Sequence, residues 1–229
     1  MLNQSTIFIL IIAAFVFSII AQSMVNSKFN KYSQVPTRRG ITGSQAARMI
    51  LDSASLHDVK IEMTRGHLSD HYDPSRRVLR LSEATYMSPS IAAVGVAAHE
   101  AGHALQHKEQ YGPLMLRTLC AQTTGIGSRL AWPLFIFGLI LSFEPLLWAG
   151  IALYGLVFLF TLITLPVEYN ASSRALANLT QLGIVDYDER NGANEVLSAA
   201  AKTYVASALM AALQLLRLLS IANRGRRRN

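Results

Sequence analysis

The sequence predicts an α+β, mainly helical protein that is anchored in a membrane by about three transmembrane helices and carries a short β-sheet. Long runs without charged side chains predict the membrane helices, because a helix needs about 20 consecutive apolar residues to cross a bilayer. Of the 229 residues, 51% are hydrophobic and only 15% are charged, whereas about a quarter of the residues of a soluble domain are charged. A stretch of alternating apolar and polar residues predicts the sheet.

The first charge-free run, residues 1–27, is interpreted as a retained N-terminal anchor. No basic residue precedes its apolar core, while Lys28 follows it, and a secretory signal peptide has the opposite order. A second run, 145–167, is long enough to cross the membrane alone. Residues 130–143 are shorter, and we expect them to form a transmembrane hairpin with the second run, turning at Glu144.

The net charge of +7 suggests a nucleic-acid partner, but the distribution of the charge argues against one. The 21 Lys and Arg residues are absent before Lys28 and between Leu130 and Ala171, so they flank the predicted spans. Cytoplasmic loops of membrane proteins carry an excess of Lys and Arg. We therefore expect the N-terminus outside, and residues 28–125 and 168–229 in the cytoplasm.

The connector after the first run leads into a helix and a short sheet. Thr42 and Gln45 have the spacing of a capping box, which marks the start of a helix. Residues 59–64 alternate between apolar and polar side chains, the pattern of a half-buried strand. A turn is expected at 73–74, and residues 76–81 after it are predicted to form a second strand.

An HExxH motif lies in an apolar helical run, with His99, Glu100 and His103 as its fixed members. A helix advances 100° per residue, so the two histidines lie one turn apart on the same face, and both imidazoles can bind one metal ion. Glu100 projects beside them, where it can take a proton from water at the metal. The motif therefore predicts a zinc site of a hydrolase. Cys120 is the only cysteine, so no thiolate metal cluster can form.

The limits of the motif helix follow from its flanking residues. Ser88 as N-cap and Pro89 at the first helical position predict its start, and we expect it to run to about Lys108. Gly102 inside the helix costs about 1 kcal/mol relative to alanine. We therefore expect a close neighbour at this glycine, either the metal or a packed backbone.

A catalytic zinc ion usually has three protein ligands and an open position for water. His107 lies on the same face as His103, but it is eight residues from His99, about 12 Å of helix rise. We therefore expect it to be either a packing residue or a residue that supports the metal ligands from outside. Glu168 ends the second uncharged run and is the better candidate. From the residues alone, it can be either a ligand or a residue that marks the membrane boundary.

The two segments together resemble the gluzincin membrane peptidases, in which HExxH is joined by a downstream Glu-aromatic-x-Ala-Asp pattern. HtpX-type proteases and CAAX prenyl endopeptidases are examples. Residues 168–171, Glu-Tyr-Asn-Ala, match this pattern, but Ser172 stands at the position of the aspartate. The segments His-Glu-Ala-Gly-His-Ala-Leu-Gln-His, Pro-Val-Glu-Tyr-Asn-Ala-Ser and Asp-His-Tyr-Asp-Pro are closer to the YugP-type bacterial membrane zinc metallopeptidases, and the resemblance covers most of the chain.

The resemblance implies Zn²⁺ as cofactor and Glu168 as the third metal ligand beside His99 and His103. The aspartate of the relatives supplies a contact outside the metal ligands. Because Ser172 stands in place of this aspartate, the residue that makes the contact here is open. Asn170 or Arg174 can make it instead.

The order helix, strand, strand, helix ahead of the motif also resembles the upper half of the zincin fold, whose edge strand holds the substrate beside the metal. By this resemblance, residues 76–81 form the edge strand and pair with an extended peptide by strand addition. Either of the two predicted strands can be the edge.

The last part of the chain, 168–229, is expected to be a cytoplasmic helical part with a basic C-terminus. Gly183 is predicted as a helix C-cap, and residues 184–195 as a solvated loop. Residues 203–216 are uncharged but only 14 residues long, and a fourth span would export the terminal arginines, against the charge rule. We favour a helix that packs on the catalytic domain or lies at the membrane surface, where these arginines contact anionic lipid.

The sequence thus predicts four parts: a 1–27 anchor, a 28–125 zincin-like subdomain, a 126–167 transmembrane hairpin and the 168–229 helical part. The function that we expect is a zinc endopeptidase of the bacterial plasma membrane, which cleaves peptide or membrane-protein substrates at the cytoplasmic face of the lipid bilayer. Nothing in the sequence indicates an oligomeric state.

Two questions about function stay open in the sequence. The residue that stabilises the oxyanion can be any of several polar side chains: Tyr72, His71, Arg174 or Tyr204. The alternative to the enzyme is a non-catalytic membrane scaffold or regulatory protein with a structural zinc site. Glu100 is intact, although a structural site does not need it, and this favours the enzyme.

Overall fold

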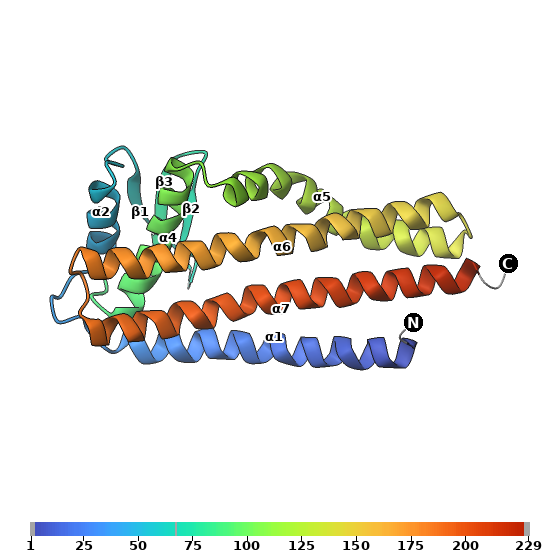
Figure 1. Cartoon of the computed structure of the whole chain (residues 1–229), viewed down its shortest axis with the longest axis horizontal. Helices are drawn as coiled ribbons and strands as arrows, with labels where there is room; N and C mark the ends of the chain where they lie inside the picture. The colour runs from blue at the N-terminus through green and yellow to red at the C-terminus, as the bar shows by residue number, and fades with distance from the viewer. Residues whose placement is uncertain (1–2, 67, 227–229) are drawn as a thin grey trace. The chain divides into compact units, whose positions relative to one another are not determined.

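The computed structural model describes residues 3–66 and 68–226 (Figure 1). It confirms the predicted α+β, mainly helical class. The helices and strands are α1 (Gln4–Ser33), α2 (Gly43–Ser53), β1 (Lys60–Thr64), β2 (His71–Asp73), β3 (Val78–Ser82), α3 (Glu83–Tyr86), α4 (Ile91–Lys108), α5 (Gly112–Ile140), α6 (Glu144–Gln181) and α7 (Tyr187–Arg226).

Contacts between residues divide the chain into two compact units. Unit 1 comprises Met1–Ile20, Pro113–Pro166 and Thr203–Asn229, and unit 2 comprises Ala21–Gly112 and Val167–Lys202. The long helices α1, α6 and α7 are divided between the two units, whereas α5 lies in unit 1 except for its first residue, Gly112. The HExxH motif and Glu168 both belong to unit 2.

Four helices of the described chain, α1, α5, α6 and α7, are long and apolar enough to cross a membrane. The sequence predicted about three, because the apolar stretch 203–216 seemed too short on its own. In the structure this stretch is the middle of a continuous helix. Its C-terminal part belongs to unit 1, where Leu218 packs against Phe135 and Ile151. From Thr203 onward, α7 belongs to unit 1 and not to unit 2, which contains the HExxH motif. The other alternative, a helix that lies at the membrane surface, stays a prediction.

In unit 1, α5 and α6 form the predicted hairpin, which turns at residues 141–143. The side chains are small where the two helices approach most closely: a Cβ atom added to Gly150 would lie 2.6 Å from the backbone nitrogen of Phe135. Helices without a large side chain at the contact can bring their backbones together, and this is a common device of membrane helix pairs. The outward-facing residues of this pair are mostly large and apolar, as lipid contact requires.

The sheet of unit 2 has the strand order β1-β3-β2, with β1 parallel and β2 antiparallel to β3. The prediction that residues 76–81 form the edge strand is therefore wrong: β3 is the central strand, and β1 and β2 are the edges. The side chains of Leu79 and Leu81 are fully buried, as expected for a central strand. β2 has only three residues, too few to show the alternation that reveals a strand in sequence.

The helices of unit 2 begin at residues whose side chains satisfy free backbone groups. The predicted capping box of α2 is confirmed, since the hydroxyl of Thr42 accepts from the backbone N–H of Gln45 and the Gln45 side chain accepts from that of Thr42. α4 begins two residues later than predicted, with Ser90 as N-cap. The carbonyl of Pro89 accepts a hydrogen bond from the N–H of Thr37 at 2.8 Å, which keeps the residues ahead of Ser90 extended.

The turn between α6 and α7 is shorter than predicted. Gly183 is the C-cap of α6, as expected, with φ +61° and its N–H donating to the carbonyl of Thr180. Residues 184–195 were predicted to be a solvated loop, but α7 already begins at Tyr187. The buried carboxylate of Glu189 accepts from the backbone N–H groups of Asp186 and Arg38, at 2.8 and 2.6 Å. The bond with Asp186 satisfies a free backbone N–H at the start of α7. In the sequence, this segment is recognisable only as a polar stretch.

Candidate metal centre

The motif helix α4 presents the two histidines as the spacing predicted. The centroids of the His99 and His103 rings are 4.8 Å apart, and the rings are nearly perpendicular, at 84°. α4 crosses the core of unit 2 next to the sheet (Figure 1). Because most of the helix is buried, the two rings lie in a place where polar groups require partners.

Glu168 of α6 supplies the third side chain. Its Oε2 atom lies 3.2 Å from Nε2 of His99 and 3.7 Å from Nε2 of His103, and the carboxylate is only 3% exposed. The ligand atoms of the three residues all lie within 4.8 Å of one another, and within 3–66 and 68–226 this is the group of His, Cys, Asp and Glu residues that could hold a metal ion. His107 does not belong to the group.

A close contact between two backbones brings Glu168 to the histidines. A Cβ atom added to Gly102 would lie 2.7 Å from the carbonyl oxygen of Ala171. The expectation of a close neighbour at this glycine is confirmed, and the neighbour is a packed backbone. Glycine at this position lets α4 and α6 approach until the side chain of Glu168, three residues before Ala171, reaches both imidazoles.

The charges and donor atoms of the site suit a cation. A buried carboxylate requires hydrogen bonds or a positive charge beside it, and Oε2 of Glu168 lies within 4 Å of Nε2 of both histidines. Burial lowers the pKa of His103, but the hydrogen bond to Glu168 and the charges of Glu100 and Glu168 outweigh burial, so that the pKa lies above its ordinary value. A metal ion in place of the proton satisfies the same demand. Two imidazole nitrogens and one carboxylate oxygen are a donor set that suits Zn²⁺.

Each histidine has a hydrogen-bond partner at its second nitrogen, as metal-binding histidines usually do. Nδ1 of His99 lies 3.1 Å from Oγ of Ser172, and Nδ1 of His103 lies 3.0 Å from Oε1 of Gln106. The sequence left open whether Asn170 or Arg174 replaces the contact of the missing aspartate. In the structure, Ser172 itself makes the contact to His99.

Gln106 was missed in the sequence, although a signal was present. Its side chain is fully buried, and its Nε2 donates to the carbonyl of Val167 and to Oδ1 of Asn170. A glutamine three residues after a candidate metal ligand, on the buried side of a mostly apolar helix, is an unusual buried polar group. Only the fold shows which partners justify it.

Glu100 lies next to the metal-ligand group and is partly exposed. In the described part of the chain, its side chain has no hydrogen bond or salt bridge. Its negative charge reaches His103 and raises the pKa of that imidazole. A carboxylate that is accessible and not held by a cation can accept a proton.

The four alternatives for the oxyanion differ in their surroundings. The hydroxyl of Tyr72, on β2, lies 2.9 Å from Nδ1 of His107 on α4. His71 contacts the carbonyl of Ser69. Arg174 is held by Glu109, and Tyr204 belongs to unit 1. Of these, Tyr72 contacts the motif helix directly.

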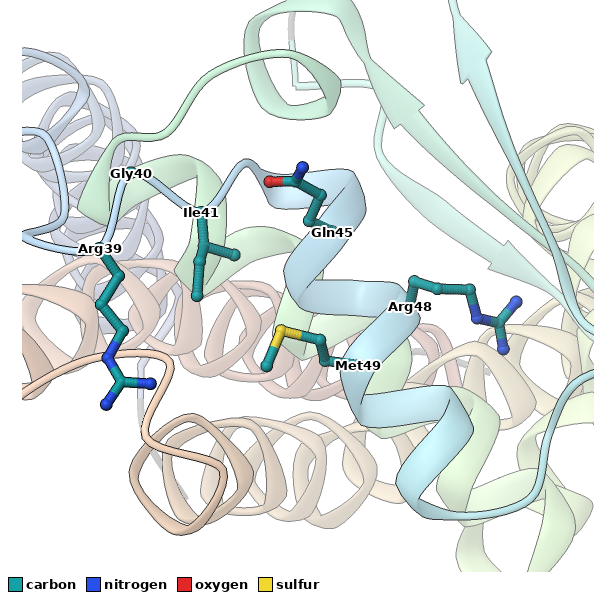
Figure 2. A pocket seen from close by; sticks show the side chains of 6 residues that line it. All are labelled: Arg39, Gly40, Ile41, Gln45, Arg48 and Met49. Atoms are coloured by element: carbon teal, nitrogen blue, oxygen red, sulfur yellow. The ribbon is translucent and has the colours of Figure 1, made fainter.

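A shallow hollow of about 560 Å³ lies elsewhere on unit 2, at the start of α2 (Figure 2). Its lining residues are Arg39, Gly40, Ile41, Gln45, Arg48 and Met49. The guanidinium group of Arg48 donates to the carbonyls of Val59 and Leu56, so its charge has a structural role. The hollow contains none of the metal-ligand group.

Comparison with known proteins adds two findings to this geometry. A family model described as "Putative neutral zinc metallopeptidase" matches residues 7–223. The chain is 50% identical over 220 residues to the "Putative membrane protease YugP" of Bacillus subtilis (strain 168). The matched region covers 96% of this chain and 98% of the relative. No solved structure matches the chain.

Proposed function

Because the chain belongs to the neutral zinc metallopeptidase family, we propose that it is a membrane-embedded endopeptidase that hydrolyses peptide bonds at the cytoplasmic face of the membrane. The observation that carries this proposal is the convergence of His99, His103 and Glu168 beside the accessible carboxylate of Glu100. A structural metal site would not need that carboxylate.

The donor and acceptor atoms of the four site residues suggest a role for each of them. Nε2 of each histidine and the carboxylate of Glu168 would hold the metal ion. Zn²⁺, when bound, would act as a Lewis acid, which polarises the scissile carbonyl and lowers the pKa of water to near neutral pH. Glu100 accepts the proton of the attacking water and returns it to the leaving amine.

For the substrate, we propose pairing with the edge strand β2. An extended peptide can add to a sheet edge through its backbone hydrogen bonds. Of the two edges, β2 is the one tied to α4, through the hydroxyl of Tyr72 and the ring of His107. A peptide on this edge would run beside the motif helix. Substrates would be chains that reach the bilayer surface, because unit 2 is joined to helices that are apolar enough to span it.

The charge distribution supports a cytoplasmic position for unit 2. Fourteen of the 21 Lys and Arg residues fall in the ranges of this unit, and basic residues near spans are retained in the cytoplasm. If all four long helices cross the membrane, both termini lie on the outer side. The terminal arginines then oppose the rule, but they are fewer than the basic residues of unit 2.

The test is the Glu100→Gln variant of the full chain, purified in detergent. We expect it to bind one zinc ion, as the unchanged protein does, and to lose cleavage of an unfolded protein substrate. Glu168→Ala should lose both the zinc and the activity, and a chelator should abolish cleavage by the unchanged protein. Glu83→Gln, at an exposed glutamate of α3, is the matched control and should remain active.

Two results would contradict the proposal. Full proteolysis by Glu100→Gln would exclude this residue as the base. Zinc in the unchanged protein without cleavage of any unfolded substrate would favour the alternative, a scaffold with a structural metal.

A further inference from the structure

We propose that Gln106 holds His103 in the tautomer that can bind the metal, and that Asn170, Arg174 and Glu109 hold Gln106 in turn. This inference rests on the proposed metal site. It assigns to four residues outside the metal ligands a positioning role that the motif does not reveal. The contacts run from the ligand to the far end of α4 and across to α6.

The orientation of the Gln106 amide follows from its partners. The carbonyl of Val167 can only accept a hydrogen bond, and Nε2 of Gln106 lies 2.8 Å from it. The other end of the amide, Oε1, therefore faces Nδ1 of His103, at 3.0 Å. An oxygen at this position requires a hydrogen on Nδ1. The neutral ring then has its lone pair on Nε2, the nitrogen on the side of Glu168.

The next contact fixes the amide of Asn170. Its Oδ1 accepts from Nε2 of Gln106 at 2.9 Å and from Nε of Arg174 at 2.7 Å. Arginine has donors only, so it determines which end of the Asn170 amide faces Gln106. The guanidinium group donates two further bonds to the carboxylate of Glu109, both at 2.7 Å. A bidentate pair of this kind has a defined geometry.

The chain of contacts also ties two metal ligands to each other. Gln106 lies on α4, three residues after His103, and it contacts the backbone of Val167, the neighbour of Glu168 on α6. Because the glutamine is fully buried and all of these groups have partners, the network is rigid. His103 and Glu168 therefore cannot move apart without breaking hydrogen bonds in the interior.

The experiment measures zinc affinity by competition with a chromophoric chelator, using the full chain in detergent. Gln106→Met keeps the size of the side chain but removes both its donor and its acceptor. We expect it to bind zinc about ten- to hundredfold more weakly, the usual loss when an outer partner of a metal ligand is removed. The loss of zinc affinity should be smaller for Asn170→Ala, because Asn170 acts through Gln106. It should be smaller still for Arg174→Lys, because Arg174 acts through Asn170. The visible spectrum of the Co²⁺-loaded Gln106→Met protein should also differ from that of the unchanged protein.

Asn178→Ala is the matched control. Asn178 lies on α6 and donates to the carbonyl of Arg174, but it does not contact Gln106, so its loss should leave zinc affinity unchanged. In the double variant of Gln106→Met and Asn170→Ala, the loss should equal that of Gln106→Met alone, because Asn170 acts only through Gln106.

The outcomes separate this inference from the proposed function. If the unchanged protein binds zinc and cleaves substrate while Gln106→Met binds zinc within about twofold of it, the positioning role is wrong and the proposed function stands. A lower unfolding temperature of the metal-free variants without a change in affinity or Co²⁺ spectrum also contradicts the inference. If the unchanged protein binds no zinc, the proposed function itself fails.

Discussion

The two helices that carry the proposed metal ligands obtain their positions in different ways. α4 lies within unit 2, and thirteen of its 18 residues are buried, so its two histidines are aligned by the helix itself. α6 begins in unit 1 and enters unit 2 after Pro166, where Glu168 follows two residues later. The third ligand therefore depends on contacts between helices. In the proposed metal site, helix geometry alone aligns the two histidines, whereas contacts between helices place Glu168. Variants can separate these two contributions.

The largest effect is expected where α4 and α6 touch. Gly102→Ala places a methyl group against the carbonyl oxygen of Ala171, where the calculated separation is only 2.7 Å. Neither backbone can yield without moving a helix, and overpacking of this kind destabilises a protein by about 1–3 kcal/mol. We expect a lower unfolding temperature of the metal-free protein and weaker zinc binding, because α6 moves and takes Glu168 with it.

Gly112→Ala is the control for this variant. Nothing lies within 4 Å of a Cβ atom at Gly112, so the same substitution should leave stability unchanged or raise it slightly. Equal unfolding temperatures and zinc affinities for the two variants would show that the approach of α6 to Gly102 does not position Glu168.

The same division explains how much of the site could be predicted from sequence. The alignment of His99 and His103 follows from their spacing of four residues, and the exclusion of His107 follows from its separation of eight residues from His99. From the residues alone, Glu168 is only one of two alternatives, because no local pattern relates it to His103, which lies 65 residues earlier in the chain. The resemblance to known peptidases, not chemistry, selected it as a ligand.

The errors in the fold have a similar cause. The sheet was predicted, but its edge was not, because strand order depends on pairing and the three-residue β2 leaves no pattern. The helical character of residues 203–216 was recognised, but the continuity of α7 and its packing in unit 1 were not. Both features arise from contacts between distant parts of the chain. Gln106 belongs to the same group, since two of its three partners, Val167 and Asn170, are on another helix.

A smaller effect should follow from changes at Ser172, the partner of His99 on α6. Ser172→Ala removes the oxygen to which Nδ1–H of His99 can donate, and we expect zinc affinity to fall by about tenfold. Ser172→Asp offers a charged acceptor in the same place and should bind zinc more tightly than Ser172→Ala. Chelator competition measures both.

Ser173→Ala tests the neighbouring, exposed serine and should leave zinc affinity unchanged. The comparison with Gln106→Met is also informative. Nδ1 of His99 contacts one hydroxyl group, which can rotate. Nδ1 of His103 contacts an amide that is held by a buried hydrogen-bond network. A greater loss from Ser172→Ala than from Gln106→Met would reverse the order that this difference predicts.

The smallest effect concerns the outer link between the two helices, the pair of Glu109, the C-cap of α4, and Arg174 on α6. The hydrogen bonds from Arg174 hold the pKa of Glu109 below its ordinary value. A carboxylate with a lowered pKa stabilises the fold at every pH above its unfolded pKa, near 4.5, and this contribution is lost as the pH falls through the folded pKa.

Glu109→Gln should therefore lower the free energy of unfolding at pH 7 and lose that difference as the pH falls below about 4.5. The carboxylate is 53% exposed, so solvent screens the pair, and the difference should be no more than about 1 kcal/mol. Unfolding measured at pH 7, 5 and 3.5 tests this, and added salt at pH 7 should reduce the difference further. A difference that is the same at all three pH values would mean that the variant removes packing and not a charge. In that case Arg174 would be positioned for Asn170 by the fold of α6 itself, without help from α4.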